Sequence, residues 1–305
     1  MRDNMNVKSI ILSATLCLCG ISAAAQDYAA PALRSPVVAI EYTGQRCRYC
    51  PTSMRNLLER QKEHGEENYI ICAMHHLESY SLLPGNNVSL FNAEALVYAE
   101  STKIHAGVPQ LSYNSLGEYL TDNTLDEMFL EPDLLECTGS VILNEDRTYD
   151  ISIKTRLRSD QTETIGNKRI DLMLWSLEND IVAIQDDNGV WTYPAHKHIF
   201  RGSVNGTWGV PYEIGSEYKA VLPLPEAVSV PENTEVVAFF VDSDSKVILD
   251  ACYFKIKTGP AGIEDVEAAP ADDADAPMFN VLGQQIRNPH PGQIYIQNGK
   301  KHIAK

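Results

Sequence analysis

The sequence contains few basic side chains for its length. Lys and Arg together number 25, against 41 Asp and Glu, so the formal net charge is −16 over 305 residues. Binding to nucleic acid needs a basic face that displaces counterions from phosphates, and this balance therefore argues against a nucleic-acid partner. Apolar residues make up 44% of the chain, which is enough for packed cores.

Long hydrophobic runs are also lacking. The apolar run at residues 10–21 is too short to span a bilayer permanently, and we expect no transmembrane helix in the mature chain. A basic start with Arg2 and Lys8 precedes this run, and three alanines before Gln26 follow it. This order predicts a signal peptide at residues 1–25 and an exported protein located in the periplasm, the outer membrane or at the cell surface.

Several catalytic signatures are missing as well. The chain has no Ser in a nucleophile-elbow pattern, no glycine loop that would cradle phosphate and no His-Glu-x-x-His helix. We therefore expect no cofactor.

Cysteine is the residue type that carries chemistry here. Seven are present, and removal of the leader takes Cys17 and Cys19. Each of these two follows a leucine, where lipoprotein processing prefers a small residue, so a lipid anchor is disfavoured. The mature chain keeps five: Cys47, Cys50, Cys72, Cys137 and Cys252. Five is an odd number, so at least one thiol stays unpaired or pairs with another chain.

The segment at residues 36–135 alternates strand and helix patterns. Apolar runs at residues 36–43 and 69–75 predict two buried strands, and the intervening helix ends near His64. Short links between these elements imply a parallel strand pair. We further expect the segment at residues 77–104 to be mostly helical after a turn at Pro84 and Gly85, a strand at 107–113 and a helix around 125–134.

The pattern then changes to short strands separated by turns. Residues 136–257 predict an all-β, immunoglobulin-like antiparallel sandwich. Residues 258–277 predict an acidic, solvated linker, because the stretch from Gly259 to Pro277 contains six acidic and no basic side chains. The last stretch, residues 278–305, predicts a small β tail.

Cys47 and Cys50 stand where the first strand gives way to the helix. Helix amides and the flanking Arg46 and Arg48 favour the thiolate form of Cys47, which is the species that attacks a disulfide. Three readings stay open for the pair: a redox-active dithiol, a static disulfide at the helix start, and a metal site. A metal would need further ligands from Cys72, His75 and His76, and on a strand only one of these histidines shares a face with Cys72.

On these residues the chain resembles the thioredoxin superfamily. That resemblance implies that Cys47 attacks, that Cys50 resolves, and that Glu41, six residues before Cys47, moves the proton. It also implies that Val108 and Pro109 form a cis-proline step beside the disulfide, which shapes the substrate groove. The usual Trp before the pair and the Gly-Pro within it are replaced here by Arg46 and by Arg48 and Tyr49.

Residues 36–257 further resemble the outer-membrane-protein-28 family of bacterial envelope proteins. The motifs are EYTGQRCRYCP at residues 41–51, HKHIFR at 196–201 and NGTWG at 205–209. The resemblance implies a thioredoxin-like domain followed by a β-sandwich. In the tail, FNVLGQQ at residues 279–285 resembles a shortened C-terminal sorting module of type IX-like secretion.

Other residues have plainer interpretations. His196 and His198 would share one face of a strand, and we interpret them as strand-edge residues rather than as metal ligands. Cys137 and Cys252 lie in the first and last strands of the sandwich, and spacing alone does not establish a bridge between them. We interpret Trp175, Trp191 and Trp208 as packing residues.

Two functions remain. One is thiol–disulfide exchange on thiols or disulfides of envelope proteins, with outer-membrane association. The other is a non-catalytic surface or assembly protein that retains a structural disulfide.

Overall fold

The computed structural model describes most of the chain between Ser35 and Thr258 and parts of the tail. The described residues are 35–81, 83–85, 87–104, 107–117, 128–129, 133–158, 165–258, 278–280, 285–286, 290, 294–297 and 300–303. The predicted signal peptide, most of the predicted helix at residues 125–134, and nearly all of the predicted acidic linker lie outside these residues.

The N-terminal part contains the strand–helix–strand unit that the sequence predicts. The strands β1 (Val37–Thr43) and β2 (Tyr69–His75) pair in parallel, and the helix α1 (Cys50–His64) joins them. The strand β3 (Gln110–Tyr113) pairs antiparallel to β1 and follows the cis peptide bond between Val108 and Pro109. Leu57 of α1 is buried against this sheet in a cluster with Val37 and Ala39 of β1.

The prediction of a mostly helical segment at residues 77–104 was wrong in extent. Among the described residues of this segment, helical structure is confined to a 3₁₀ turn, η1 (Glu78–Ser81), and the helix α2 (Ala93–Ser101). Asn92 has extended backbone angles, and its side chain accepts a hydrogen bond from the amide of Glu94, so α2 begins at this cap. The segment before it is held instead by Gln45, whose side chain accepts a hydrogen bond from the Leu90 amide.

One continuous sheet crosses the division that the sequence suggests at residue 136. Its strands lie in the order β15-β14-β6-β11-β2-β1-β3, with β12 (Val210–Pro211) also paired to β6. The added strands are β6 (Ile170–Glu178), β11 (Ile199–Ser203), β14 (Thr234–Asp242) and β15 (Ile248–Lys255). The junction is a parallel pairing of Ile199 with Ala73. The division into two domains stays a prediction, but both parts contribute strands to one sheet.

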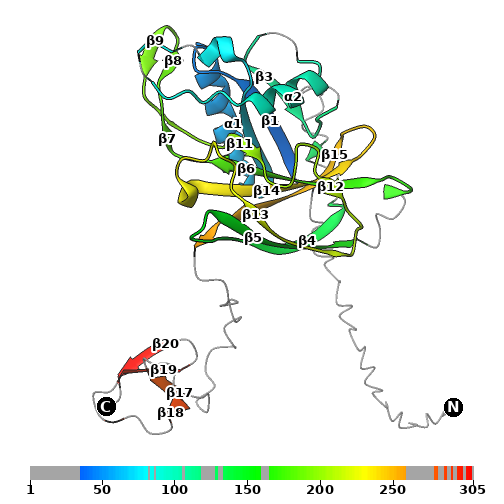
Figure 1. Ribbon diagram of the computed structural model, residues 1–305, viewed down its shortest axis with the longest axis vertical. Helices are drawn as coiled ribbons and strands as arrows, with labels where there is room; N and C mark the ends of the chain where they lie inside the picture. Colours follow the sequence, from blue (N-terminus) through cyan, green and yellow to red (C-terminus); the bar gives the residue numbers. More distant parts are fainter. Residues whose placement is uncertain are drawn as a thin grey trace, which may run out of the picture. The chain divides into compact units, whose positions relative to one another are not determined.

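A second sheet completes the sandwich-like part (Figure 1). It contains β13 (Glu217–Pro223), β5 (Thr148–Leu157), β4 (Leu135–Leu143) and β16 (Lys257–Thr258), in that order. A disulfide between Cys137 of β4 and Cys252 of β15 joins the two sheets, with the Cα atoms 6.7 Å apart. Cys72 is the remaining cysteine of the described residues and is a buried free thiol.

The main sheet is covered on both faces. The helix α2 packs on one face, where Tyr98 lies in the same apolar cluster as Trp175 of β6 and Val38 of β1. On the other face, α1 covers β1 and β2 and the second sheet covers β6 and β14. Trp175 is buried as predicted, and Trp208 packs against the same cluster, whereas Trp191 is 42% exposed.

The tail forms a separate small sheet. Its strands are β17 (Met278–Asn280), β18 (Gln285–Ile286), β19 (Ile294–Gln297) and β20 (Lys300–Ile303), in the order β18-β17-β19-β20.

Candidate functional site

The Cys47–Cys50 pair forms a disulfide at the start of α1. The two Cα atoms are 5.4 Å apart, and Cys50 is the first residue of the helix. The Cys50 amide donates to the Cys47 sulfur at 3.1 Å. Tyr49, at the N-cap, makes no side-chain capping bond. The Cys50 amide at the start of the helix instead has the Cys47 sulfur as an acceptor. A reduced Cys47 would therefore feel both this donor and the positive end of the helix dipole.

The predicted cis-proline step lies beside this disulfide. The carbonyl oxygen of Val108 is 3.4 Å from the Cys47 sulfur, and the peptide bond from Val108 to Pro109 is cis. The disulfide sulfur has no hydrogen to donate, so this contact becomes a hydrogen bond only when Cys47 is a protonated thiol.

Glu41 lies on β1 behind the disulfide and is fully buried. Burial raises its pKa from 4.5 to about 7, and the Ser53 hydroxyl opposes the rise. Neither carboxyl oxygen of Glu41 has a hydrogen-bond partner of normal geometry within the described residues. A carboxyl group in this state titrates in the range where it can take or give a proton at neutral pH.

Glu41 and Cys50 line a cavity of about 180 Å³. His75 of β2, on the same face of the sheet as Glu41, and His196 also line this cavity, with ring centres 6.1 Å apart. Burial, followed by the charges of His196, Arg201 and His76, holds the pKa of His75 well below its usual value. Burial also lowers the pKa of His196, although a backbone hydrogen bond to Ala183 opposes this. Both imidazoles are therefore neutral near pH 7.

A hairpin from the C-terminal part closes the cavity. Its strands are β8 (Gln185–Asp187) and β9 (Val190–Thr192). The side-chain amide of Gln185 donates to the backbone oxygens of Gly44 and Cys47, at 3.3 and 3.1 Å. The amide of Asp186 donates to the Gln45 oxygen at 2.8 Å.

Two further contacts hold the hairpin. The amide of Asn188 donates to the Arg48 oxygen at 3.1 Å, and Arg55 of α1 pairs with Asp187 at 3.0 Å. Cys47 and Cys50 are only 3% and 2% exposed. The bonds made by Gln185, Asp186 and Asn188 hold the loop that carries the disulfide against the hairpin.

Sequence reasoning missed this hairpin, Gln185 and the cavity role of His75 and His196. The available signal was Asn188-Gly189, the pair that favours a two-residue hairpin turn. Both residues have positive φ, 55° and 90°. The histidines gave no usable signal, because β2 and the segment at His196 meet only through tertiary packing.

The prediction that His196 and His198 share one face of a strand was wrong. His196 ends the short strand β10 (Ala195–His196), which pairs with β7 (Ile181–Val182), and His198 has a positive φ of 54° that separates it from that strand. The two rings consequently have different partners.

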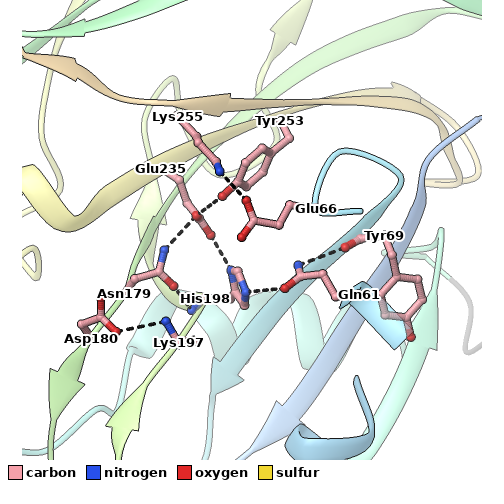
Figure 2. A network of polar contacts seen from close by, with 10 residues as sticks. All are labelled: Gln61, Glu66, Tyr69, Asn179, Asp180, Lys197, His198, Glu235, Tyr253 and Lys255. Atoms are coloured by element: carbon pink, nitrogen blue, oxygen red, sulfur yellow. Dashed lines mark hydrogen bonds and ion pairs between the residues drawn. The ribbon is translucent and has the colours of Figure 1, made fainter. Parts of the chain in front are cut away.

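His198 belongs to a second buried network (Figure 2). Its Nδ1 lies 2.6 Å from Oε1 of Glu235, and its Nε2 lies 3.0 Å from Oε1 of Gln61. Burial raises the pKa of Glu235, but hydrogen bonds from His198, Tyr253 and Asn179 outweigh it and hold the pKa below its usual value. Because Gln61 lies on α1 and Glu235 on β14, this network ties the helix to the C-terminal strands.

Among the described residues, no three His, Cys, Asp or Glu side chains are placed to hold a metal ion. Cys72 lies in the apolar cluster under α2, whereas His75 faces the cavity on the opposite side of β2. Within the same residues, no helix has both the length and the apolar character needed to cross a membrane.

Comparisons with known proteins identify a shared fold. No family model matches the chain, and no curated protein matches it. Among solved structures, HBP35 of Porphyromonas gingivalis is similar, with a TM-score of 0.58 and 16% identity over 89% of this chain and 98% of that one. A domain of the outer membrane lipoprotein Omp28 from the same organism matches with 20% identity. It covers 42% of this chain and 99% of that domain, but at a TM-score of 0.29 it carries no argument.

Proposed function

We propose that this chain is an exported envelope protein, related to the outer-membrane-protein-28 family, whose N-terminal part is thioredoxin-like and exchanges thiols and disulfides with other envelope proteins. The observation that carries the proposal is the arrangement around one disulfide. Cys50 begins α1 and is bonded to Cys47 in the loop before the helix, the cis step at Pro109 lies against Cys47, and the buried Glu41 lines the same cavity as Cys50.

In the reducing direction, the Cys47 thiolate attacks one sulfur of a substrate disulfide and releases the other as a thiolate. Cys50 then attacks Cys47 in the mixed disulfide, which releases the second substrate sulfur. Two electrons pass from the pair to the substrate. The proton of Cys50 passes to Glu41, and both substrate thiolates are protonated from solvent. A dithiol reductant must return the pair to its reduced form, and the oxidising direction is the reverse sequence.

The neutral imidazoles of His75 and His196 extend this proposal. They line the same cavity as Glu41 and Cys50, so they place two neutral proton acceptors in that cavity. Their role is to move the proton that Glu41 takes from Cys50.

Reduction of insulin disulfides with dithiothreitol as electron source tests the exchange chemistry. We expect the wild-type protein to accelerate the reaction over dithiothreitol alone and Cys47→Ser to abolish the acceleration. The double variant Cys137→Ser/Cys252→Ser is the matched control and should retain it. Cys50→Ser should accumulate a mixed disulfide at Cys47, which mass spectrometry detects even where turnover is lost. No acceleration by the folded wild-type protein, and no trapped adduct, would refute the proposal.

The second candidate is a non-catalytic binding or assembly protein in which this disulfide is a static staple. The burial of both sulfurs under the β8–β9 hairpin favours this candidate. This candidate predicts that the wild-type protein has no exchange activity. Cys47→Ser should then change only the stability of the protein.

Export is tested separately. N-terminal sequencing of the mature protein should begin at Gln26, and protease treatment of intact cells should cleave the protein if it lies on the surface. A mature protein that starts at Met1 would contradict the predicted signal peptide.

A further inference from the structure

Exposed apolar and aromatic side chains gather around the disulfide-bearing loop. Ten large side chains of these types are exposed among the described residues, and six of them lie on the β7–β10 segment or on the loops that it touches. These six, together with Arg46 and Arg48, are called the hairpin surface: Tyr49, Val88, Val182, Val190, Trp191 and Tyr193. They are between 42% and 64% exposed, and such a concentration marks an interaction site in a protein of this size.

Hydrogen bonds connect the hairpin to the two loops that carry the rest of this surface. The turn of the β8–β9 hairpin lies on the loop before α1, through the bond from the Asn188 amide to the Arg48 oxygen. At the other end, the Tyr193 hydroxyl bonds to Asn87 at 3.2 Å. Gln45 bonds to the Val88 oxygen and lies under the same loop. The surface therefore runs from Tyr49 across the hairpin to Val88.

The outer strand of this hairpin has a free edge. Asp186 pairs with Trp191 across the hairpin, and the Asp186 amide points away from β9 to the Gln45 oxygen. In an antiparallel ladder, both residues of such a pair direct their backbone groups outward. The amide and carbonyl of Trp191 therefore face the open side of β9, where no described segment bonds to them. A free edge of this kind pairs readily with an extended chain.

The loop that contacts β8 and the hairpin turn carries two positive charges, although the chain as a whole is strongly acidic. Arg46 and Arg48 are exposed, and neither has an ion-pair partner among the described residues. Guanidinium groups without an ion-pair partner attract carboxylates. Arginine and aromatic residues also contribute most of the binding energy at many protein–protein interfaces.

From these observations we infer that the hairpin surface binds an extended polypeptide segment that carries apolar and acidic side chains. The segment adds a strand to the edge of β9, its apolar side chains contact Trp191 and Tyr193, and its carboxylates pair with Arg46 and Arg48. Binding requires no reaction of the disulfide, so it does not depend on the proposed exchange activity.

Fluorescence anisotropy with two labelled peptides tests the inference. One peptide alternates valine with glutamate around a central phenylalanine, and the other replaces each glutamate by lysine. The full-length oxidised protein should bind the acidic peptide at least about tenfold more tightly than the basic one. Raising the salt concentration should narrow this preference, because the arginines are exposed.

Variants assign the binding to individual groups. Trp191→Ser should weaken acidic-peptide binding by about tenfold or more. The double variant Arg46→Ser/Arg48→Ser should bind both peptides with similar affinity. Val221→Ser, at a valine 62% exposed on β13, is the matched control and should bind as the wild type does.

Three outcomes would overturn the inference: equal binding of the two peptides by the wild-type protein, unchanged binding by Trp191→Ser, or displacement of the acidic peptide by a single-stranded oligonucleotide. The last outcome would identify the surface as a nucleic-acid site. The disulfide should remain oxidised throughout, which mass spectrometry verifies, so a failure here does not bear on the exchange chemistry.

Discussion

At the scale of single residues, Glu41 is the group on which the proposed proton transfer depends. Its pKa is raised from 4.5 to about 7 because the ionised form is buried. The folded state therefore holds more protons than the unfolded state between these values. The resulting destabilisation is absent below about pH 4.5, grows as the pH rises, and is complete above about pH 7.

The variant Glu41→Gln removes this effect. The free energy of unfolding of the variant, relative to wild type, should increase by about 3 kcal/mol between pH 4.5 and pH 8. Urea unfolding at a series of pH values measures it. Glu59→Gln, at an exposed position on α1, is the control and should show no such trend. A pH-independent difference for Glu41→Gln would show that the carboxyl group does not titrate near neutrality.

At the scale of elements, we predict that the β8–β9 hairpin limits access to the disulfide, because it is bonded to the loop that carries Cys47. Gln185→Ala removes the bonds to the oxygens of Gly44 and Cys47, each worth about 1 kcal/mol. The hairpin should open more often, and the rate at which a small thiol reduces the Cys47–Cys50 disulfide should rise about fivefold or more. Thiol trapping over time gives this rate. Val221→Ala is the control, and equal rates for wild type and Gln185→Ala would mean that the hairpin does not limit access.

The His198 network is the second element-level contact, because it joins α1 to β14 and β15. His198→Ala leaves the Glu235 carboxylate buried without its imidazole partner, which should cost about 3–5 kcal/mol of stability. Double replacement with Glu235→Gln should recover part of this loss, and denaturant unfolding of the four proteins measures the coupling. An additive double variant would show that the two groups act independently.

At the scale of the whole molecule, the shared sheet predicts one cooperative unit. Cys72 of β2 is a buried thiol in the N-terminal part, whereas Trp175 of β6 reports on the C-terminal part. Because β11 joins the two parts, the free energy of exposing Cys72 to a labelling reagent should equal the free energy of unfolding from tryptophan fluorescence. Labelling of Cys72 at a clearly lower free energy would show that the N-terminal part opens by itself.

The sequence predicts local structure here better than long-range structure. The strands β1 and β2 and the helix α1 follow from patterns within short windows. The pairing of Ile199 with Ala73 leaves no local pattern, because the residues of β11 and of β2 do not indicate which strand lies beside them. The same holds for the site: the cysteines follow from their spacing and Glu41 and Pro109 from the thioredoxin resemblance, whereas Gln185, His75 and His196 meet only through the fold.

The redox equilibrium of the Cys47–Cys50 pair tests the central claim most directly. The purified oxidised protein is equilibrated with glutathione buffers of increasing reducing power, and thiol trapping with mass spectrometry gives the fraction of each disulfide that is reduced. We expect the Cys47–Cys50 pair to be reduced within the glutathione range, before Cys137–Cys252. A Cys47–Cys50 pair that stays oxidised in the most reducing buffer would contradict it and identify a static staple.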